Sequence, residues 1–262
     1  TGVDHIDVEA AKSRGAIVQN VPYYGENTVA EFAFALLLAV SRKICLANSR
    51  VKEVGNFSQD GLTGFDLLGK TIGVIGTGRI GYHAAKIAKG FGMNIIAYDV
   101  LQNTKVAQEI GFVYKTLPEV LAESDVLTIH VPYNKDTHHL LNAENIKLIK
   151  HGAVLVNTAR GGVIETEALL CAFASGQLAG AGLDVLEEEP ATQNELGAVA
   201  GSSLSASSYR TVVANHALID LPNVVITPHN AFNTKEAILR ILDTTVENIR
   251  SFIEGNPKNK VA

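Results

Sequence analysis

Apolar positions recur along most of the chain in two alternating patterns, one typical of buried strands and one typical of amphipathic helices. Short apolar runs occupy 71–75, 94–98, 126–130, 153–157, 179–184 and 224–227, with a shorter one near Phe112. Between them, apolar residues return every three or four positions over 80–91, 103–110, 117–123, 144–150 and 165–175. Continuous apolar strands that alternate with helices are typical of parallel sheets covered on both faces. The pattern therefore predicts an α/β fold with a doubly wound parallel sheet.

Segments outside this alternation carry further signals. Residues 5–14 and 16–21 have the spacing of one helix and one strand, and 234–253 has the spacing of a long helix. A capping box at Thr28-Val29-Ala30-Glu31 predicts a helix that runs to about Asn48. Its broad apolar face fits either ordinary core or, in part, a subunit or interdomain contact. Residues 191–220, which include GSSLSASS, lack clear periodicity and predict a long insertion or a partly mobile loop.

Composition and charge narrow the class of protein. The 262 residues are 47% hydrophobic and 19% charged, with a net charge of −5, as in an ordinary globular protein. The negative charge argues against nucleic acid or an anionic membrane as a partner. The apolar run 32–40 is too short to span a bilayer, and no signal peptide is visible, so a cytoplasmic location is expected. Cys45 and Cys171 lack metal-ligand spacing, which predicts buried thiols in a reducing compartment and no metal site.

The stretch 70–99 holds a strand, a glycine turn, a helix, a second strand and an acid. Gly76-Thr77-Gly78-Arg79-Ile80-Gly81 has the form G-x-G-x-x-G and follows an apolar run directly. The first glycine allows a tight turn, the second lets the backbone approach a pyrophosphate, and the third lets the helix pack closely on the strand. The helix N-terminus then directs its free N–H groups at the phosphates.

Asp99 stands at the end of the second strand of this stretch, eighteen positions after Gly81. A carboxylate at that position can accept hydrogen bonds from both hydroxyls of the adenosine ribose and repel a 2′-phosphate. The stretch therefore predicts a Rossmann domain that binds NAD rather than NADP. Arg79, inside the turn, is either a further pyrophosphate contact or a solvated arginine.

Polar clusters at the predicted carboxyl ends of the strands supply candidate chemistry, because ligands of doubly wound sheets bind at that edge. Arg160 precedes two glycines and has the geometry to bind a carboxylate with two N–H groups. His229 lies between Pro228 and Asn230, and an imidazole suits proton transfer near neutral pH. The run 187–189 is acidic and is ordinarily a solvated loop, but Glu189 is singled out by the proline that follows it. A hydride donor, a proton donor and an anion clamp together favour carbonyl reduction.

These motifs resemble the D-isomer-specific 2-hydroxyacid dehydrogenase family. The resemblance rests on GVDHID, NVPYYGENTVAE, GVIGTGRIG with Asp99, HVP, VNTARGGVIE, GLDVLEEEP and TPHNAF, which occur in family order over nearly the whole chain. It implies that Arg160 clamps the substrate, that His229 donates the proton to the carbonyl, and that Glu189 is the acid paired with His229. It also implies NAD contacts at Arg79, Ile80, Asp99, Val131, Pro132, Thr137, Thr158, Ala159 and Asp184.

Within the family, the long spacer between Glu189 and His229 and the segment HNAFNTKEA are most similar to the D-lactate dehydrogenase branch. The resemblance therefore favours pyruvate and D-lactate as the substrate pair. A hydroxypyruvate, glyoxylate or branched 2-keto acid reductase stays a competing interpretation, as does a non-catalytic NAD(H)-sensing scaffold. A homodimer formed through the cofactor domain is expected.

The resemblance also implies a division of the chain. Residues 1–25 are expected to be the C-terminal part of a flavodoxin-like substrate domain, 26–229 the NAD-binding domain, and 230–262 a helix that returns to the substrate domain. Most of that flavodoxin-like domain is absent before Thr1, so the sequence is expected to be either a fragment of a longer protein or a truncated form.

Overall fold

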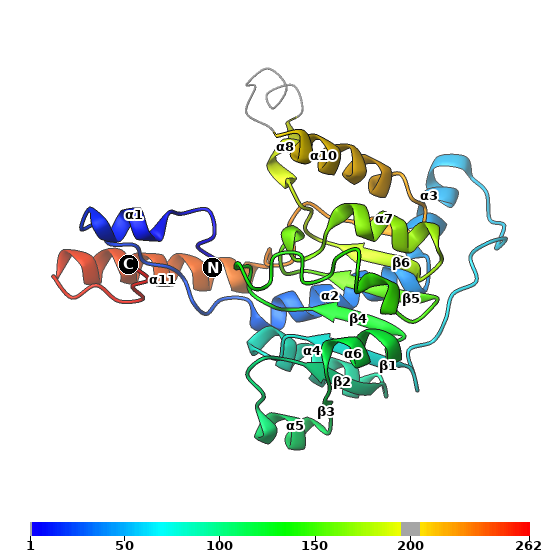
Figure 1. Cartoon of the computed structure of the whole chain (residues 1–262), viewed down its shortest axis with the longest axis horizontal. Coiled ribbons are helices and arrows are strands. Elements are labelled where there is room, and N and C mark those ends of the chain that lie inside the picture. The colour runs from blue at the N-terminus through cyan, green and yellow to red at the C-terminus, as the bar shows by residue number, and fades with distance from the viewer. Residues whose placement is uncertain (1, 195–204) are drawn as a thin grey trace.

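The chain folds around a seven-stranded parallel sheet in a computed structural model that describes residues 2–194 and 205–262 (Figure 1). The strand order is β3-β2-β1-β4-β5-β6-β7, so the sheet grows outward in both directions from β1 and β4. The strands are β1 (Thr71–Ile75), β2 (Asn94–Tyr98), β3 (Val113–Tyr114), β4 (Val126–Ile129), β5 (Ala153–Asn157), β6 (Leu178–Leu183) and β7 (Val224–Ile226). This arrangement confirms the predicted doubly wound Rossmann sheet.

Helices cover both faces of the sheet. One face carries α2 (Glu26–Ser41), α4 (Arg79–Gly90) and α5 (Thr104–Ile110), and the other carries α6 (Leu117–Glu123), α7 (Thr166–Ala174) and α10 (Ala206–Ile219). Neighbouring strand residues alternate between the two cores: Val74 packs on the first face and Ile75 on the second. Because the strands are buried on both faces, they read as continuous apolar runs.

A second, smaller part of the molecule lies beside the sheet. There α1 (Val8–Ser13) and most of α11 (Lys235–Ile253) lie away from the strands (Figure 1). Residues 16–21 do not form the predicted strand. They run extended, and Gln19 makes one antiparallel bridge to Lys260 of the C-terminal tail. The side chain of Gln19 also donates hydrogen bonds to the carbonyl oxygens of Asn248 and Lys258, which join the two ends of the described chain.

The predicted long helix from Thr28 to Asn48 is two helices. The first, α2, begins at Glu26 with Gly25 as its N-cap, so Thr28 lies inside the helix and is buried. The chain breaks at Lys43, whose φ of 52° is left-handed, and resumes as α3 (Ile44–Val54). The break lets Phe65 N donate to the carbonyl oxygen of Ser41.

The apolar face of α2 settles most of the question that its breadth raised. Leu36 and Leu37 are buried in the core that α2 shares with the sheet. At Gly182 of β6 and Gly180 beside it, a side chain would crowd Leu36 and Val40, which is why this helix lies so close to the strands. Ordinary core therefore accounts for these α2 side chains.

Three further predictions are corrected. The predicted insertion at 191–220 contains the end of α8 (Glu189–Gln193) and all of α10, where Ser205 caps the helix by accepting from Ser208 N. Residues 195–204 of that insertion lie outside the described residues. The predicted helix 144–150 is only a 3₁₀ turn, η1 (Ile146–Leu148), whose N-cap is Asn145, and Asn142 accepts from the N–H groups of Glu144 and Asn145 just before it. Cys45 and Cys171 are exposed rather than buried, because each lies on the solvent side of its helix.

No helix in the described part of the chain combines the length and the hydropathy needed to cross a membrane.

Candidate functional site

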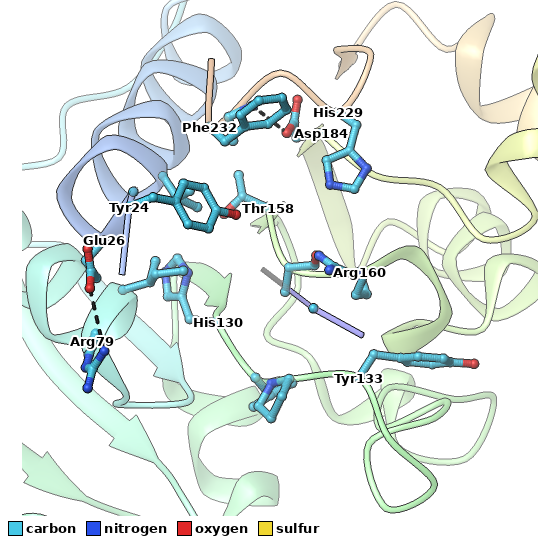
Figure 2. A pocket seen from close by; sticks show the side chains of 18 of the residues that line it. Tyr24, Glu26, Arg79, His130, Tyr133, Thr158, Arg160, Asp184, His229 and Phe232 are labelled. Carbon is cyan, nitrogen blue, oxygen red and sulfur yellow. Dashed lines mark hydrogen bonds and ion pairs between the residues drawn. The ribbon is translucent and has the colours of Figure 1, made fainter. Parts of the chain in front are cut away.

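A cleft of about 580 Å³ opens at the carboxyl ends of the central strands (Figure 2). Its lining comes from the strand ends β4, β5 and β6, from the glycine turn, and from two segments outside the sheet near residues 2–4 and 22–26. These two segments, which connect the smaller part of the molecule to the sheet, therefore form one side of the cleft. Ligands of doubly wound sheets bind at this edge.

The glycine turn has the geometry that its sequence requires. Gly76 has a φ of +91°, and a Cβ on it would come within 2.9 Å of backbone and side-chain atoms of His130 and Val131. A Cβ on Gly81 would overlap the carbonyl oxygen of Gly76, so this glycine permits α4 to start directly against the turn. A Cβ on Gly78 would meet nothing within 4 Å. The open side of the turn at Gly78 is therefore available to a ligand.

The carboxylate of Asp99 faces the same turn. Its Oδ2 accepts from the backbone N of Thr77 at 2.6 Å and from the Thr77 hydroxyl at 3.0 Å, and its Oδ1 accepts from Leu101 N at 2.9 Å. A carboxylate has about four acceptor positions, so these three bonds fix the group and leave room for a further donor.

Arg160 projects into the cleft immediately after β5, with one third of its side chain exposed. Its Nε and Nη2 donate to the two carboxylate oxygens of Asp4 at 3.3 and 3.4 Å, and Nη1 donates to the Ala159 carbonyl oxygen at 2.8 Å. A guanidinium has five N–H groups. Three of them bind these described residues, which leaves two that can reach a bound anion.

Asp4 responds to this contact. Burial raises the pKa of its carboxyl, but the hydrogen bond and the charge of Arg160 outweigh that effect and hold the pKa below its usual range. Asp4 is therefore ionised at neutral pH and holds the plane of the guanidinium.

His229 also lines the cleft, and Glu189 lies beside its imidazole. The imidazole Nδ1 is 3.4 Å from Glu189 Oε2, and the side chains are 41% and 23% exposed, so the imidazole keeps access to the cleft. The backbone of His229 is left-handed, with a φ of 52°, and its N–H donates to the Asp184 carbonyl oxygen. The buried carboxylate of Asp184 accepts from the Thr227 hydroxyl and from the N–H groups of Asn230 and Ala231. These bonds fix the loop that carries the histidine.

Comparison with known proteins identifies the family. The model of the D-isomer specific 2-hydroxyacid dehydrogenase NAD-binding domain matches residues 34–231. This chain belongs to the D-isomer-specific 2-hydroxyacid dehydrogenase family.

Individual relatives agree with that assignment. The chain is 41% identical over 261 residues to an aromatic 2-oxoacid reductase of Clostridium sporogenes, covering 99% of this chain and 76% of that one. It is 39% identical to a glyoxylate reductase of Thermococcus litoralis, covering 99% and 74%. Among solved structures, it superposes with a TM-score of 0.88 and 39% identity on a D-lactate dehydrogenase from Aquifex aeolicus complexed with NAD and lactic acid, covering 99% and 77%. The protein is thus an NAD-dependent oxidoreductase of the 2-hydroxyacid dehydrogenase family.

The family's cofactor fits the residues present. The turn leaves open space at Gly78, the helix α4 begins there with no side chain of its N-cap to cover its first N–H groups, and an acid ends β2. Beside them, His130 Nδ1 and Thr158 Oγ1 are buried polar atoms with no hydrogen-bond partner in the described structure, and both residues line the cleft. Buried polar atoms are normally satisfied, so unsatisfied ones at a cleft indicate a ligand that supplies the missing partner.

His130 adds no charge to this dehydrogenase cleft. Burial of the ring lowers its pKa to about 4, and its Nε2 shares a hydrogen bond of 2.9 Å with the Thr128 hydroxyl. The ring is therefore neutral at physiological pH, as suits a surface beside an uncharged ring of a cofactor or substrate.

Most of the remaining residues predicted from the sequence line the cleft, and one lies outside its lining. The cleft is also lined by Ile80, Val131, Pro132 and Ala159. Arg79 lines it too, held between Glu26, whose carboxylate is 3.7 Å from Nη1, and the face of Tyr23, whose ring centroid is 3.6 Å from Cζ. Thr137 lies outside the cleft lining: its hydroxyl donates to the Pro132 carbonyl oxygen at 2.6 Å and accepts from Asn134 N. Thr137 therefore stabilises the loop after β4 without lining the cleft itself.

Sequence reasoning missed several cleft residues of this dehydrogenase. Tyr24, Tyr133 and Phe232 supply aromatic walls (Figure 2). Burial raises the pKa of the Tyr24 hydroxyl, and burial together with the nearby charge of Glu187 raises that of Tyr133. All three follow a proline or a glycine-flanked motif within a few residues, but only the fold shows that these distant segments meet.

The acidic run before Pro190 is not a solvated loop. Glu187 binds His139 Nε2 at 2.6 Å through one carboxylate oxygen and accepts from the Thr166 hydroxyl at 2.9 Å through the other. Glu188 accepts from the Ser208 hydroxyl of α10 at 2.8 Å. Both acids therefore anchor the segment that carries Glu189.

Proposed function

We propose that this chain reduces a short 2-keto acid to the D-2-hydroxy acid, with pyruvate as the first candidate. The observation that carries the proposal is that Arg160 and His229 line one cleft beside the glycine turn, with Glu189 3.4 Å from the imidazole of His229. Similarity to the D-lactate dehydrogenase of Aquifex aeolicus and to a pyruvate reductase of Chlamydomonas reinhardtii, 39% identical with a TM-score of 0.84, supports pyruvate.

In this proposal Arg160 binds the carboxylate of the substrate. Asp4 fixes the guanidinium from one side, and the two N–H groups left over point a planar pair of donors at the substrate. Binding by this fork orients the keto carbon, and correct orientation alone contributes a large part of such rate enhancements.

His229 donates a proton to the keto oxygen in the same proposal. Glu189, at 3.4 Å from Nδ1, holds the ring so that Nε2 faces the substrate. Asp184 holds the backbone on both sides of the histidine, so the position of the donor is fixed by hydrogen bonds rather than by the side chain alone.

The cofactor residues proposed for NAD follow the same edge of the sheet. Gly76, Gly78 and Gly81 with the N-terminus of α4 would hold the pyrophosphate, with Arg79 beside it. Asp99 would bind the adenosine ribose, and Ile80, Val131, Pro132, Thr158, Ala159 and Asp184 would surround the nicotinamide half, with Thr137 supporting the loop. When bound, NADH supplies the hydride that the reduction needs.

A larger keto acid is the second candidate. The relative from Clostridium sporogenes is an aromatic 2-oxoacid reductase, and the cleft of this chain has three aromatic side chains in its wall, Tyr24, Tyr133 and Phe232. Aromatic walls of this kind favour a substrate side chain that is larger than a methyl group. Glyoxylate, hydroxypyruvate and branched 2-keto acids are further candidate substrates, and a scaffold that only binds NAD(H) is the candidate from a different functional class.

The division of the chain, its assembly and its location belong to the same proposal. Residues 1–25 and 230–262 join through Gln19 and Asn248 as one substrate-binding part, and 26–229 form the cofactor part. Exposed apolar side chains on and after α3, among them Val54 at 74% and Phe57 at 81% exposure, support a homodimer through the cofactor part. The two free, exposed cysteines fit a reducing cytoplasm.

The test is NADH oxidation by the chain with pyruvate, glyoxylate, hydroxypyruvate, phenylpyruvate and a branched 2-keto acid, beside NADH binding by fluorescence. We expect the highest kcat/KM with pyruvate. The variant Arg160→Gln should raise the KM for the keto acid by at least tenfold, because the carboxylate loses its paired donors, and leave NADH binding in place. NADH binding with no turnover of any keto acid would contradict the proposal and favour the scaffold.

A further inference from the structure

A chain of hydrogen bonds connects the edge of the sheet to the acid of the cofactor site. The backbone N–H of Asn103 donates to the Tyr114 hydroxyl at 3.0 Å. That hydroxyl lies 2.8 Å from the Thr77 hydroxyl, which in turn lies 3.0 Å from Asp99 Oδ2. Tyr114 belongs to β3, the edge strand, and its Cα is paired in register with Ala97 of β2, two positions before Asp99.

The proton direction along this chain follows from the chemistry of its two ends. An ionised carboxylate can only accept, so the single hydroxyl proton of Thr77 points at Asp99. Thr77 Oγ1 must then accept from Tyr114, and the Tyr114 oxygen accepts from the peptide N–H of Asn103. All the hydrogen bonds in the series therefore donate in the same direction, from Asn103 toward Asp99. Hydrogen bonds arranged in this way polarise and strengthen one another.

The structure around the chain fixes its members in place. Tyr114 and Thr77 are half-buried, and the ring of Tyr114 makes an edge contact with Phe112 at 5.2 Å between centroids. The Thr77 peptide N–H adds a second bond to the same Asp99 oxygen at 2.6 Å. Removing the Tyr114 hydroxyl would leave the Thr77 hydroxyl without its donor and free to rotate away from Asp99.

We propose that Tyr114 is a positioning residue of the cofactor site, which acts through Thr77 to hold the Asp99 carboxylate in the orientation that receives the adenosine ribose. The inference rests on the cofactor role proposed above for Asp99. Tyr114 itself does not touch the cofactor in this proposal. It favours NAD(H) binding indirectly, from the edge strand, by holding Thr77 and through it Asp99.

The test is a double-mutant cycle read from NADH binding to the 262-residue chain. Tyr114→Phe removes one hydroxyl and should raise the Kd for NADH about threefold to tenfold, the range expected for one hydrogen bond. Thr77→Val removes the intermediate hydroxyl and should weaken binding at least as much. If Tyr114 acts through Thr77, the double variant binds NADH no more weakly than Thr77→Val alone.

Cofactor preference provides a readout that a merely structural role would not move. A 2′-phosphate does not use the ribose-binding oxygens of Asp99, so Tyr114→Phe should weaken NADPH binding less than NADH binding. The matched control is Tyr82→Phe, on α4, whose hydroxyl donates to Glu109 at 3.0 Å. This control should leave both dissociation constants unchanged, and thermal unfolding should show Tyr114→Phe to be folded.

Two results would overturn the proposal. In one, Tyr114→Phe binds NADH as tightly as the wild-type chain does. In the other, the losses of Tyr114→Phe and Thr77→Val multiply in the double variant, which would mean that Tyr114 acts by a route independent of Thr77. Because the cycle is measured by binding alone, its failure is distinguishable from failure of the proposed reaction, which is measured by turnover.

Discussion

At the residue scale, the neutral imidazole of His130 has a consequence for stability. Burial lowers the pKa of this ring to about 4, against 6.5 for an exposed histidine. Between pH 4 and pH 6.5 this histidine is protonated in the unfolded chain but stays neutral in the folded chain. The unfolded state therefore binds more protons in that window, and stability falls as the pH drops through it. At pH values well above 6.5 both states are neutral and the residue contributes no pH dependence.

His130→Asn should remove this pH dependence. We expect the wild-type free energy of unfolding to fall by up to about 2 kcal/mol from pH 7 to pH 5 on account of His130, and the variant to show a correspondingly smaller fall. Urea unfolding at the two pH values measures the difference. His151→Asn, which removes an exposed imidazole, serves as the control. An equal slope in wild type and His130→Asn would contradict the prediction.

The pair of Glu189 and His229 gives a second prediction at this scale. Glu189→Gln keeps the shape of the side chain but removes the charge 3.4 Å from the imidazole. The imidazole then loses the charged partner that orients its ring, so we expect kcat/KM for keto acid reduction to fall about tenfold while NADH binding is unchanged. Steady-state kinetics and NADH fluorescence measure this, with Glu144→Gln, at an exposed acid outside the cleft lining, as the control. An unchanged kcat/KM in Glu189→Gln would contradict the proposed pairing.

At the element scale, the unit of β1, the glycine turn and α4 depends on one close contact. Gly81 sits where a Cβ would overlap the Gly76 carbonyl oxygen, while Gly78 faces open space. Glycine is thus needed at these two positions, three residues apart, for two different reasons. One glycine lets a helix pack on its own turn, and the other leaves room for a ligand.

Alanine at the two positions should separate these purposes. Gly81→Ala forces α4 away from the turn, and we expect a loss of stability of about 2 kcal/mol or more together with loss of NADH binding. Gly78→Ala meets no protein atom, so its unfolding midpoint should stay within about 2 °C of wild type while the Kd for NADH rises by at least tenfold. Thermal unfolding and fluorescence titration decide this. Equal destabilisation by the two variants would contradict the assignment.

The elements α8 and α10 show how a segment without clear periodicity can be held in place by a helix that packs on it. Asn215 of α10 is buried, and its amide donates to the Glu187 carbonyl oxygen at 2.7 Å and to the Thr192 hydroxyl at 2.8 Å. Ser208 of the same helix binds Glu188. The segment that presents Glu189 is therefore held from both its backbone and its side chains.

At the scale of the whole molecule, the two parts meet at the cleft. Residues 2–4 and 22–25 enter the lining from the smaller part, and the strand ends and the glycine turn enter from the sheet. The contact between Asp4 and Arg160 crosses directly from one part to the other. Closure of such a cleft about a bound substrate excludes water from the reacting groups.

The proposed homodimer yields the prediction for this scale. Size-exclusion chromatography with light scattering should give about twice the 27.9 kDa mass of the chain. Phe57→Asp, which places a charge on the most exposed aromatic side chain after α3, should shift the population to monomer, since a buried unpaired charge destabilises an interface by several kcal/mol. Val100→Asp, on an equally exposed apolar residue after β2, is the control. A wild-type monomer would contradict the prediction.

The sequence alone determined the order of strands and helices and the identity of the cofactor turn. Those features are local and can be recognised from a few consecutive residues. A strand that is buried on both faces is a continuous apolar run, and the spacing of the glycines is set by one tight turn. The placement of Arg160 and His229 in one cleft could be predicted for a related reason, because parallel strands bring their carboxyl ends to one edge.

Tertiary structure decided what depends on contacts between distant segments. Phe65 bonds to the carbonyl oxygen of Ser41 at the break after α2, Glu188 bonds to Ser208 of α10, and Tyr114 of β3 bonds to Thr77 in the turn after β1. The two partners of each of these hydrogen bonds lie twenty or more positions apart. No local pattern records such a pairing, because its free energy comes from hydrogen bonds and burial that exist only once the chain has closed on itself.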